Sequence, residues 1–257
     1  MAVMMKDKYT EINAKTWDNW AENGSIWSVP ISGEEYAKAR EGEWGVYLTP
    51  CMTVPHEWFG ELKDKKLLGL ASGGGQQMPI FTALGAECTV FDYSDRQLAA
   101  EREVAQREGY DIAIIKGDMT QPLPFADESF DLIFHPVSNC YIEDVCHVWK
   151  ECFRILKKGG ILLAGFDNGI NFLFEEGAPF TVVNKLPFNP LKMEKERVEK
   201  MANDLEGIQF SHSMEEQLGG QLKAGFRLTD IYEDRDREEG TIGEYIPQFM
   251  ATRAVKE

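Results

Sequence analysis

A glycine-rich turn and a later acid are the residues of this chain whose types and spacing point most directly to chemistry. Gly73, Gly74 and Gly75 follow an apolar run at residues 67–71, and Asp92 ends the next apolar run. Glycines let the backbone approach a bound molecule with no Cβ in the way. A carboxylate at the end of a second strand has oxygens free to accept hydrogen bonds from a ribose diol. The pattern predicts a nucleoside-binding edge of an open α/β sheet.

Further apolar runs position these residues. Strands are expected at 111–116, 129–134 and 160–166, and Asp118 with Met119 directly follows the first of them. A helix is expected between the second and third strands of the chain, because the serine at 94 stands three residues before a glutamine, as in a capping box. Strands that alternate with helices in this way are typical of a mostly parallel sheet.

A second helix is predicted before the strand at 160–166. Val145, Trp149, Cys152 and Leu156 recur at helical spacing, and two lysines and a glycine follow at 157–159. Lysines suit the negative end of a helix dipole and glycine suits a left-handed cap. We therefore expect this helix to end at residues 157–159.

Together these landmarks resemble the class I S-adenosylmethionine-dependent methyltransferases over residues 67–166. The first turn of that family usually reads acid-x-Gly-x-Gly-x-Gly, and Gly73 and Gly75 match its second and third glycines. Gly69 stands where the acid is usually found, and Ala71 stands where the first glycine is. In that family the acid normally helps to order the turn. The two departures therefore bear on how this chain holds the methionine end of the cofactor.

The resemblance implies S-adenosyl-L-methionine as cofactor and S-adenosyl-L-homocysteine as product. It assigns the ribose hydroxyls to Asp92 and the adenine to Asp118 and Met119. The expected cofactor-binding residues are Ala71, Ser72, Gly73, Gly75, Gln77, Asp92, Tyr93, Gln97, Asp118, Met119 and His135.

The end of the chain favours this family over NAD-binding folds. Ser213 and Glu216 form a second capping box, which predicts a helix that ends near Gly225. Strands are expected at 226–232 and 246–255, and two strands joined without a helix should form an antiparallel hairpin. The expected fold is an α/β, Rossmann-like open sheet, mostly parallel, with a C-terminal antiparallel hairpin and helices on both faces.

Candidate catalytic residues follow the strand at 129–134. His135 has a suitable pKa for taking a proton, and Tyr141 lies at the same edge of the sheet. A lone histidine is equally compatible with a structural hydrogen-bonding role, and Asn139 and Tyr141 are equally compatible with capping the next helix. Asp131 begins its strand, remote from the ligand edge, so a structural role is expected for it.

Composition limits the partners. The chain has 257 residues, with 27 basic and 43 acidic residues and a net charge of −16, and it has no basic stripe for a phosphate backbone. Nucleic acid is therefore not an expected partner.

The five cysteines contain no CxxC pair and are expected to be reduced thiols, and the histidines lack metal-ligand spacing. The protein is therefore expected to use no metal. No apolar stretch approaches the ~20 residues that span a bilayer, so the chain is expected to be cytoplasmic and to have no membrane partner. The oligomeric state stays open.

Two regions lie outside the sheet pattern. We expect a helical cap or lid at 1–62, a Rossmann-like domain at 63–257, and a substrate-shaping insertion within it at about 167–212. The first region holds five of the six tryptophans: Trp17, Trp20, Trp27, Trp44 and Trp58. These rings suit a lid over a flat or apolar substrate, and they equally suit short helices packed on the flank of the sheet.

Three functions remain open from the sequence. A methyltransferase for a small-molecule acceptor is favoured, with in-line transfer of the methyl group. An NAD-dependent oxidoreductase is the alternative, because the glycine turn and Asp92 would also suit a dinucleotide. A catalytically idle cofactor-binding or partner-binding protein is the third, because Gly69 and Ala71 depart from the family turn.

Overall fold

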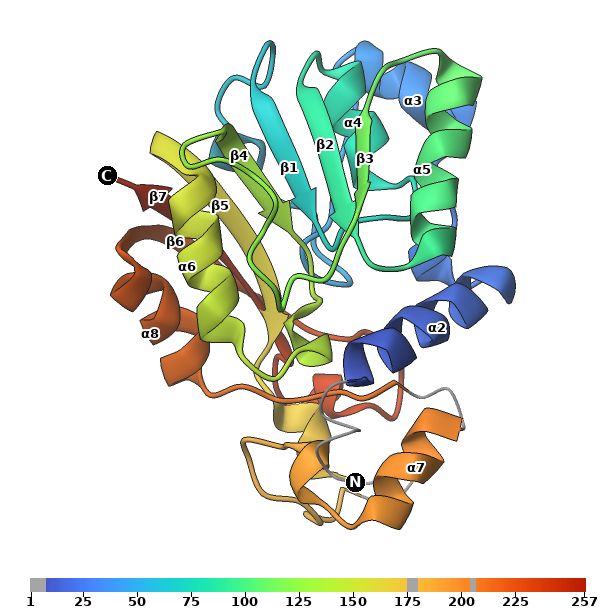
Figure 1. Cartoon of the computed structure of the whole chain (residues 1–257), viewed down its shortest axis with the longest axis vertical. Helices are drawn as coiled ribbons and strands as arrows, with labels where there is room; N and C mark the ends of the chain where they lie inside the picture. Colours follow the sequence, from blue (N-terminus) through green and yellow to red (C-terminus); the bar gives the residue numbers. More distant parts are fainter. Residues whose placement is uncertain (1–7, 175–179, 204–206) are drawn as a thin grey trace.

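A seven-stranded sheet forms the centre of the computed structural model, which describes residues 8–174, 180–203 and 207–257 (Figure 1). The strand order is β3-β2-β1-β4-β5-β7-β6. The strands are β1 (Lys66–Leu70), β2 (Glu87–Asp92), β3 (Ala113–Lys116), β4 (Phe130–His135), β5 (Leu156–Asp167), β6 (Phe226–Asp234) and β7 (Phe249–Lys256). Strands β1 to β5 pair in parallel, whereas β7 runs antiparallel to β5 and β6. The predicted fold class, with its C-terminal antiparallel hairpin, is confirmed.

Helices cover both faces of this sheet. They are α2 (Tyr9–Glu22), α3 (Gly33–Arg40), α4 (Gln77–Ala83), α5 (Asp95–Glu108), α6 (Val145–Ile155), α7 (Lys195–Asn203) and α8 (Met214–Ala224). Neighbouring residues of β1 face opposite cores, since Leu67 packs with Phe81 of α4, and Leu68 packs with Trp149 of α6. Burial on both faces explains why the parallel strands are continuous apolar runs.

Short polar signals set the helix boundaries. The Ser94 side chain accepts a hydrogen bond from the Gln97 amide at the start of α5, and Ser213 and Glu216 form a complete capping box at the start of α8. Gly225 ends α8 in the left-handed conformation. These three predictions are confirmed, and each satisfies backbone groups that a helix end leaves unpaired.

The predicted end of α6 is wrong. The helix ends at Ile155, and the two lysines belong to β5. Leu156 already pairs in parallel with Phe130 of β4, Lys157 Nζ lies 2.8 Å from Asp131 Oδ2, and Gly159 has φ +77° in the irregular start of β5. The Lys66 amide also donates to Asp131, at 2.9 Å. Asp131 therefore has the structural role that its position predicts.

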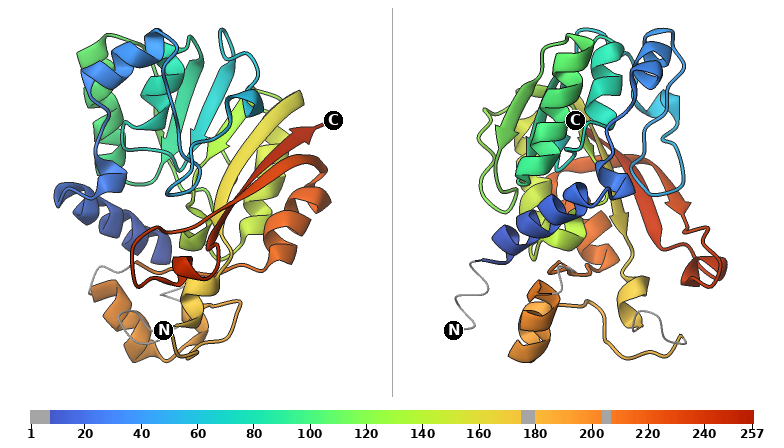
Figure 2. Two further views of the ribbon diagram at one scale, coloured as in Figure 1. Left: turned by 180° about the vertical axis from the view of Figure 1, so that it is seen from behind. Right: turned by 90° about the vertical axis from the view of Figure 1, so that its right-hand side faces the viewer.

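Segments remote in sequence gather at the carboxyl edge of the sheet. Both views in Figure 2 place α2 and α7 beyond the end of the sheet at which β1 and β2 terminate. A Cβ on Gly165 of β5 would clash with the carbonyl oxygen of Leu48, so the N-terminal segment crosses β5 in direct contact. Helix α7 belongs to the predicted insertion.

No helix among the described residues is long and apolar enough to span a bilayer.

Candidate functional site

A cavity of about 1600 Å³ opens over the carboxyl ends of the strands β1 to β5. The predicted site residues that line it are Ala71, Ser72, Gly73, Gln77, Asp92, Tyr93, Gln97, Asp118, Met119 and Tyr141. Gly75 and His135 are not among the described residues that line it. The structure therefore brings ten of these predicted residues to one space and holds two behind its wall.

Backbone amides of the glycine turn are held by the element that follows β2. The Gly73 amide donates to Asp92 Oδ2 at 3.0 Å, and the Gly74 amide donates to the Gln97 carbonyl oxygen at 3.0 Å. A Cβ on Gly73 would lie 2.7 Å from the Cβ of Gln97, and Gly74 has φ +103°. Side chains are thus excluded from both positions, and the turn becomes a floor made of backbone.

The departures at Gly69 and Ala71 have physical explanations. A Cβ on Gly69 would lie 2.6 Å from the sulfur of Met78, so a methionine of α4 fills the space that an acid would need. Ala71 adopts φ +47°, a conformation favoured by glycine, and its amide donates to the Phe91 carbonyl oxygen at 2.8 Å. The turn therefore keeps its course without the usual acid and first glycine.

A buried acid that the sequence reasoning missed supports the turn from behind. Glu101 of α5 is fully buried, and its Oε1 accepts a hydrogen bond of 2.8 Å from the Gly75 amide. Burial raises the pKa of Glu101 to about 8, the Gly75 amide offsets part of this shift, and the nearby Asp92 adds to it. Glu101 is therefore mostly protonated at pH 7. The sequence feature that could have revealed Glu101 is its position between Leu98 and Val104 on the apolar face of the helix.

Asp92 faces the cavity with its oxygens partly engaged. Oδ2 accepts from the Gly73 amide and Oδ1 from the Ser94 amide, each at 3.0 Å, so the expectation of two free oxygens is wrong. Burial raises the pKa of Asp92, against the lowering effect of these amides. A carboxylate has about four lone-pair sites, so further acceptor capacity remains toward the cavity.

The next residues at this edge are Asp118 and Met119. Asp118 Oδ1 accepts from the amide and the hydroxyl of Thr120, at 2.8 Å each, which fixes the turn after β3. Met119 is 9% exposed and lines the cavity. A carboxylate and an apolar thioether side chain therefore lie side by side along the wall that follows β3.

His135 lies behind the cavity wall with both ring nitrogens engaged. Nδ1 lies 2.9 Å from the Leu70 carbonyl oxygen, and Nε2 lies 2.8 Å from Asn139 Oδ1. Burial lowers the pKa of His135, which favours the neutral ring at pH 7. Asn139 donates to Gln217 at 3.0 Å, and Asp144 caps α6, so Asn139 neither faces an acceptor nor caps that helix.

Tyr141 lines the cavity just after the end of β4. Its ring packs edge-on against Trp17, with centroids 5.6 Å apart, and Asn13 of α2 donates to its carbonyl oxygen at 3.1 Å. Burial raises the pKa of Tyr141 well above its usual value, so the phenol is neutral at pH 7. The hydroxyl can orient a ligand as donor or acceptor.

The N-terminal tryptophans divide between cavity and core. Trp17, Trp27 and Trp44 line the cavity, whereas Trp58 is 2% exposed and donates to Asp230 at 2.9 Å. From the segment after β5, Phe172, Phe174 and Phe180 also line the cavity. Both regions outside the sheet pattern thus contribute aromatic rings to the same space.

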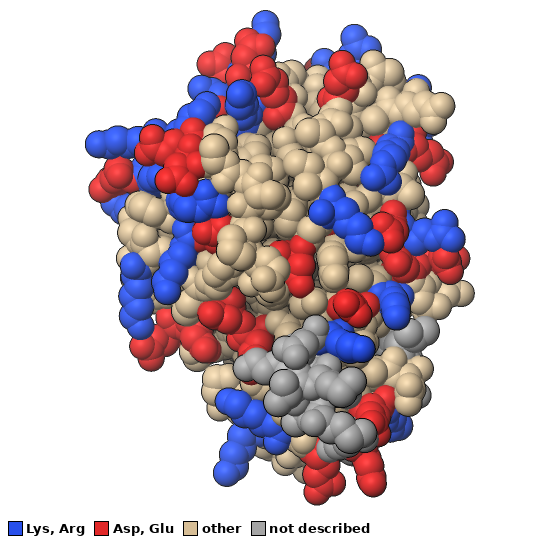
Figure 3. Space-filling model, viewed as in Figure 1, with Lys and Arg blue, Asp and Glu red and all other residues tan. Residues whose placement is uncertain are grey.

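Acidic side chains dominate the charge of this cavity. The acids that line it are Glu35, Glu43, Asp92, Asp118, Asp167, Asp236 and Glu238. Lys38 is the one basic side chain that lines it within the described ranges, and its Nζ pairs with Glu34 at 2.7 Å. Blue and red residues intermingle over the face drawn in Figure 3. The cavity lining, with seven acids and one lysine, shares the acidic character of the whole chain.

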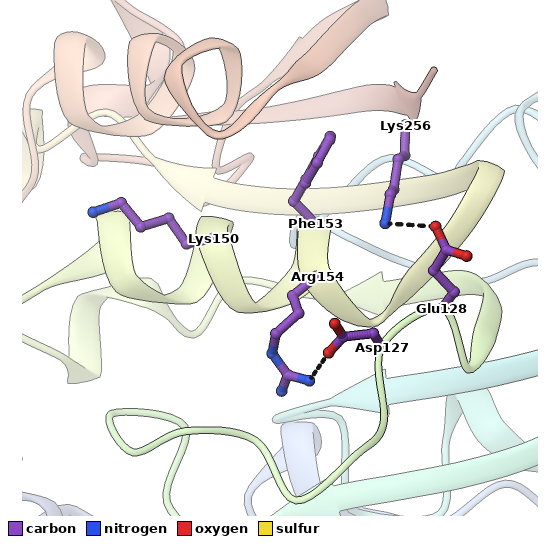
Figure 4. Close-up of a pocket in the computed structure, with 6 residues that line it drawn as sticks. All are labelled: Asp127, Glu128, Lys150, Phe153, Arg154 and Lys256. Carbon is purple, nitrogen blue, oxygen red and sulfur yellow. Dashed lines mark hydrogen bonds and ion pairs between the residues drawn. The ribbon is translucent and has the colours of Figure 1, made fainter.

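A smaller hollow of about 480 Å³ lies at the opposite end of β5 (Figure 4). Two of its three cations are occupied, since Arg154 pairs with Asp127 at 2.8 Å and Lys256 donates to the Leu156 carbonyl oxygen at 2.8 Å. Nothing in this hollow belongs to the carboxyl edge. The described residues hold no group of three or more potential metal ligands.

Comparison with known proteins agrees with this geometry. Residues 68–164 match the family described as the methyltransferase domain. The chain is 42% identical to the uncharacterized methyltransferase YbaJ of Bacillus subtilis over 95% of this chain and 97% of that protein. An S-adenosylmethionine-dependent methyltransferase from Mesorhizobium loti superposes with a TM-score of 0.59, at 18% identity, over 77% of this chain and 94% of that one.

A geranyl diphosphate C-methyltransferase from Streptomyces coelicolor, solved with Mg²⁺, geranyl diphosphate and S-adenosyl-L-homocysteine, superposes with a TM-score of 0.56 at 15% identity. That likeness covers 78% of this chain and 76% of the other, and it concerns the fold. These comparisons give the oxidoreductase alternative no support. The chain belongs to the class I S-adenosylmethionine-dependent methyltransferases.

Proposed function

We propose that this enzyme transfers the methyl group of S-adenosylmethionine to a small molecule held in the same cavity. The observation that carries the proposal is that one space is lined both by the glycine turn with Asp92 and by aromatic rings from the two regions outside the sheet pattern. Ligand pockets usually measure about 300–1,000 Å³. A cavity of about 1600 Å³ therefore has room for a cofactor and a separate acceptor.

Residues at the glycine-turn end fit the cofactor. Two side chains there, Ser72 and Gln97, each have a buried polar atom, Oγ and Oε1 respectively, without a hydrogen-bond partner among the described residues. Such atoms need a partner, which a polar ligand supplies. We assign the ribose hydroxyls to Asp92 and the adenine to Asp118 and Met119, with Ala71, Gln77 and Tyr93 completing this end.

The remaining residues position the reaction. Bound S-adenosylmethionine supplies a methyl group on a positively charged sulfur, and the walls of the cavity hold the acceptor in line with it. Placement can contribute effective molarities of about 10⁵–10⁸ M, against about 10²–10⁴-fold for a general base. Tyr141 faces the cavity and orients the acceptor, whereas His135 acts from behind by holding the Leu70 carbonyl group.

We further propose that residues 1–62 and 167–212 select the acceptor, the first as a cap and the second as an insertion. The cap is anchored to the cofactor end, because the Ile31 amide donates to the Gly75 carbonyl oxygen at 2.9 Å and Gln76 donates to the Ile26 carbonyl oxygen at 2.9 Å. Residues 1–7, 175–179 and 204–206 of these regions lie outside the described residues. Exchanging residues 167–212 for those of a relative should change acceptor preference, and an unchanged preference would contradict this assignment.

The proposal is tested by labelled methyl transfer. The protein is incubated with methyl-labelled S-adenosylmethionine and a bacterial extract from which macromolecules have been removed, and organic-soluble products are counted. We expect a labelled product with the wild-type chain and less than a hundredth of it with Asp92→Ala. Label recovered only on macromolecules added back to the reaction would contradict a small-molecule acceptor.

A further inference from the structure

One acid of the cavity is not accounted for by the cofactor. Asp167 ends β5, lines the cavity and is 5% exposed. Its Oδ1 accepts from the Gly169 amide at 2.9 Å. Its Oδ2 is buried and has no hydrogen-bond partner within the described part of the chain.

This unsatisfied oxygen lies at the acceptor end. Only Ser72, Gln97 and Asp167 among the described residues both line the cavity and hold a buried polar atom without a partner. The first two belong to the cofactor end. Asp167 ends β5, which the strand order separates from β1 by β4. This distance from the glycine turn favours a ligand other than the cofactor as its partner.

The surroundings of Asp167 define that partner. Burial raises the pKa values of Cys140 and Tyr141, and the Asp167 carboxyl adds to both shifts from its place on the same cavity wall. Burial raises the pKa of Asp167 to about 6, so it is mostly ionised at pH 7 and acts as a hydrogen-bond acceptor. Asp236 and Glu238 add negative charge to the same lining.

We propose, on the basis of the proposed function, that Asp167 anchors the acceptor by accepting a hydrogen bond from its N–H or O–H group. The acceptor is then a neutral or cationic small molecule with a donor group and a flat apolar part. The apolar part packs among rings such as Trp17 and Phe172, which line the same cavity. Anionic acceptors are disfavoured, since the acids of the lining repel them and Lys38 is already paired.

Four probes with a common phenyl group test this proposal: 2-phenylethylamine, 2-phenylethanol, methyl 2-phenylethyl ether and 3-phenylpropanoate. Each is titrated into protein saturated with S-adenosylhomocysteine, and the dissociation constant is read from the ¹⁵N–¹H signals of the tryptophan indoles. We expect the amine and the alcohol to bind at least tenfold more tightly than the ether, and the carboxylate to bind most weakly.

Asp167→Asn should remove the preference for the amine over the ether. Asparagine retains an oxygen for the Gly169 amide, and affinity for S-adenosylhomocysteine should stay within twofold. Asp127→Asn, in the hollow at the opposite end of β5, is the matched control and should keep the preference.

Equal binding of the ether, equal binding of the carboxylate, or no binding by any probe would overturn the anchor. Asp167→Asn protein that still prefers the amine to the ether would also overturn it. If the wild-type protein fails to bind S-adenosylhomocysteine, the proposed function fails instead, whatever the probes do.

Discussion

The two ends of the cavity are built in different ways. The end of the cavity that we assign to the cofactor comes from one stretch of sequence, residues 71–119, and the glycine turn there is backbone held by neighbouring residues. The rest of the cavity, which we assign to the acceptor, is assembled from segments far apart in the chain, including residues 136–142, 167–180 and 236–249. Its lining includes aromatic rings, such as Tyr141 and Phe172, and acids, such as Asp167 and Asp236.

This difference separates what is common from what is particular to this enzyme. A shared cofactor can be bound by a local turn whose backbone geometry tolerates few residue types. An acceptor is recognised by side chains, which can change without altering the sheet. Substitutions at the cofactor end should therefore alter folding and cofactor affinity, whereas substitutions at the acceptor end should alter the choice of substrate.

The largest expected effect concerns the buried support of the cofactor end. The pKa of Glu101 is raised to about 8 from 4.5, so the fold favours its protonated form. Its contribution to stability is complete below about pH 4.5 and is lost as the pH rises through 8. The difference corresponds to at most roughly 5 kcal/mol, at about 1.4 kcal/mol per pKa unit.

Glu101→Gln should remove this slope, because glutamine retains an oxygen for the Gly75 amide and cannot ionise. Urea unfolding of both proteins from pH 5 to 9 measures the difference. We expect the variant to gain stability over the wild type as the pH rises. Parallel curves would show that Glu101 is not protonated in the fold.

Asp92→Ala should have the next largest effect. It removes a carboxylate that faces the cavity and holds the Gly73 amide, and hydrogen bonds to a charged group contribute about 1.5–3 kcal/mol each. We expect affinity for S-adenosylhomocysteine to fall about 100-fold while thermal unfolding stays cooperative. Asp95→Ala, which removes a half-exposed partner of Lys116, should leave the affinity unchanged.

Gly69→Ala tests why the family's acid is absent. The new Cβ would lie 2.6 Å from the sulfur of Met78, and overpacking of this kind typically costs about 1–3 kcal/mol. Adding Met78→Ala should recover part of the loss, so the two changes should be non-additive in urea unfolding. Strict additivity would refute the steric explanation.

His135→Gln should have the smallest effect on binding. The ring does not line the cavity, and its nitrogens contact groups within the protein. Affinity for S-adenosylhomocysteine should change less than threefold between pH 6 and 8, while the melting temperature falls. A wild-type affinity that falls as His135 becomes protonated, with no such pH dependence in the variant, would place His135 in direct contact with the cofactor.

The sequence predicted the sheet and the cofactor end better than the rest. Apolar runs, capping boxes and the glycine turn are local signals, and Asp92 was found because it ends a strand at the ligand edge. The same reasoning would have selected Asp167, which ends β5, but the residue was treated as the start of an insertion. Glu101 was missed because its helix is rich in charge, although the residue lies on the apolar face.

Other outcomes depend on contacts between distant residues. The end of α6 at Ile155 coincides with the pairing of Leu156 with Phe130 of β4, a contact between residues distant in sequence. The burial of His135 depends on Asn139 and on Gln217 of α8, which no local pattern links to it. The acceptor end depends on how the terminal segments fold over the sheet.

The most direct test of the account is calorimetric titration of the purified protein with S-adenosylmethionine, S-adenosylhomocysteine and NAD in separate experiments. We predict micromolar binding of the first two and no signal with NAD. Binding of NAD alone, or no binding of S-adenosylmethionine and S-adenosylhomocysteine, would contradict the assignment of the glycine turn and Asp92 to this cofactor.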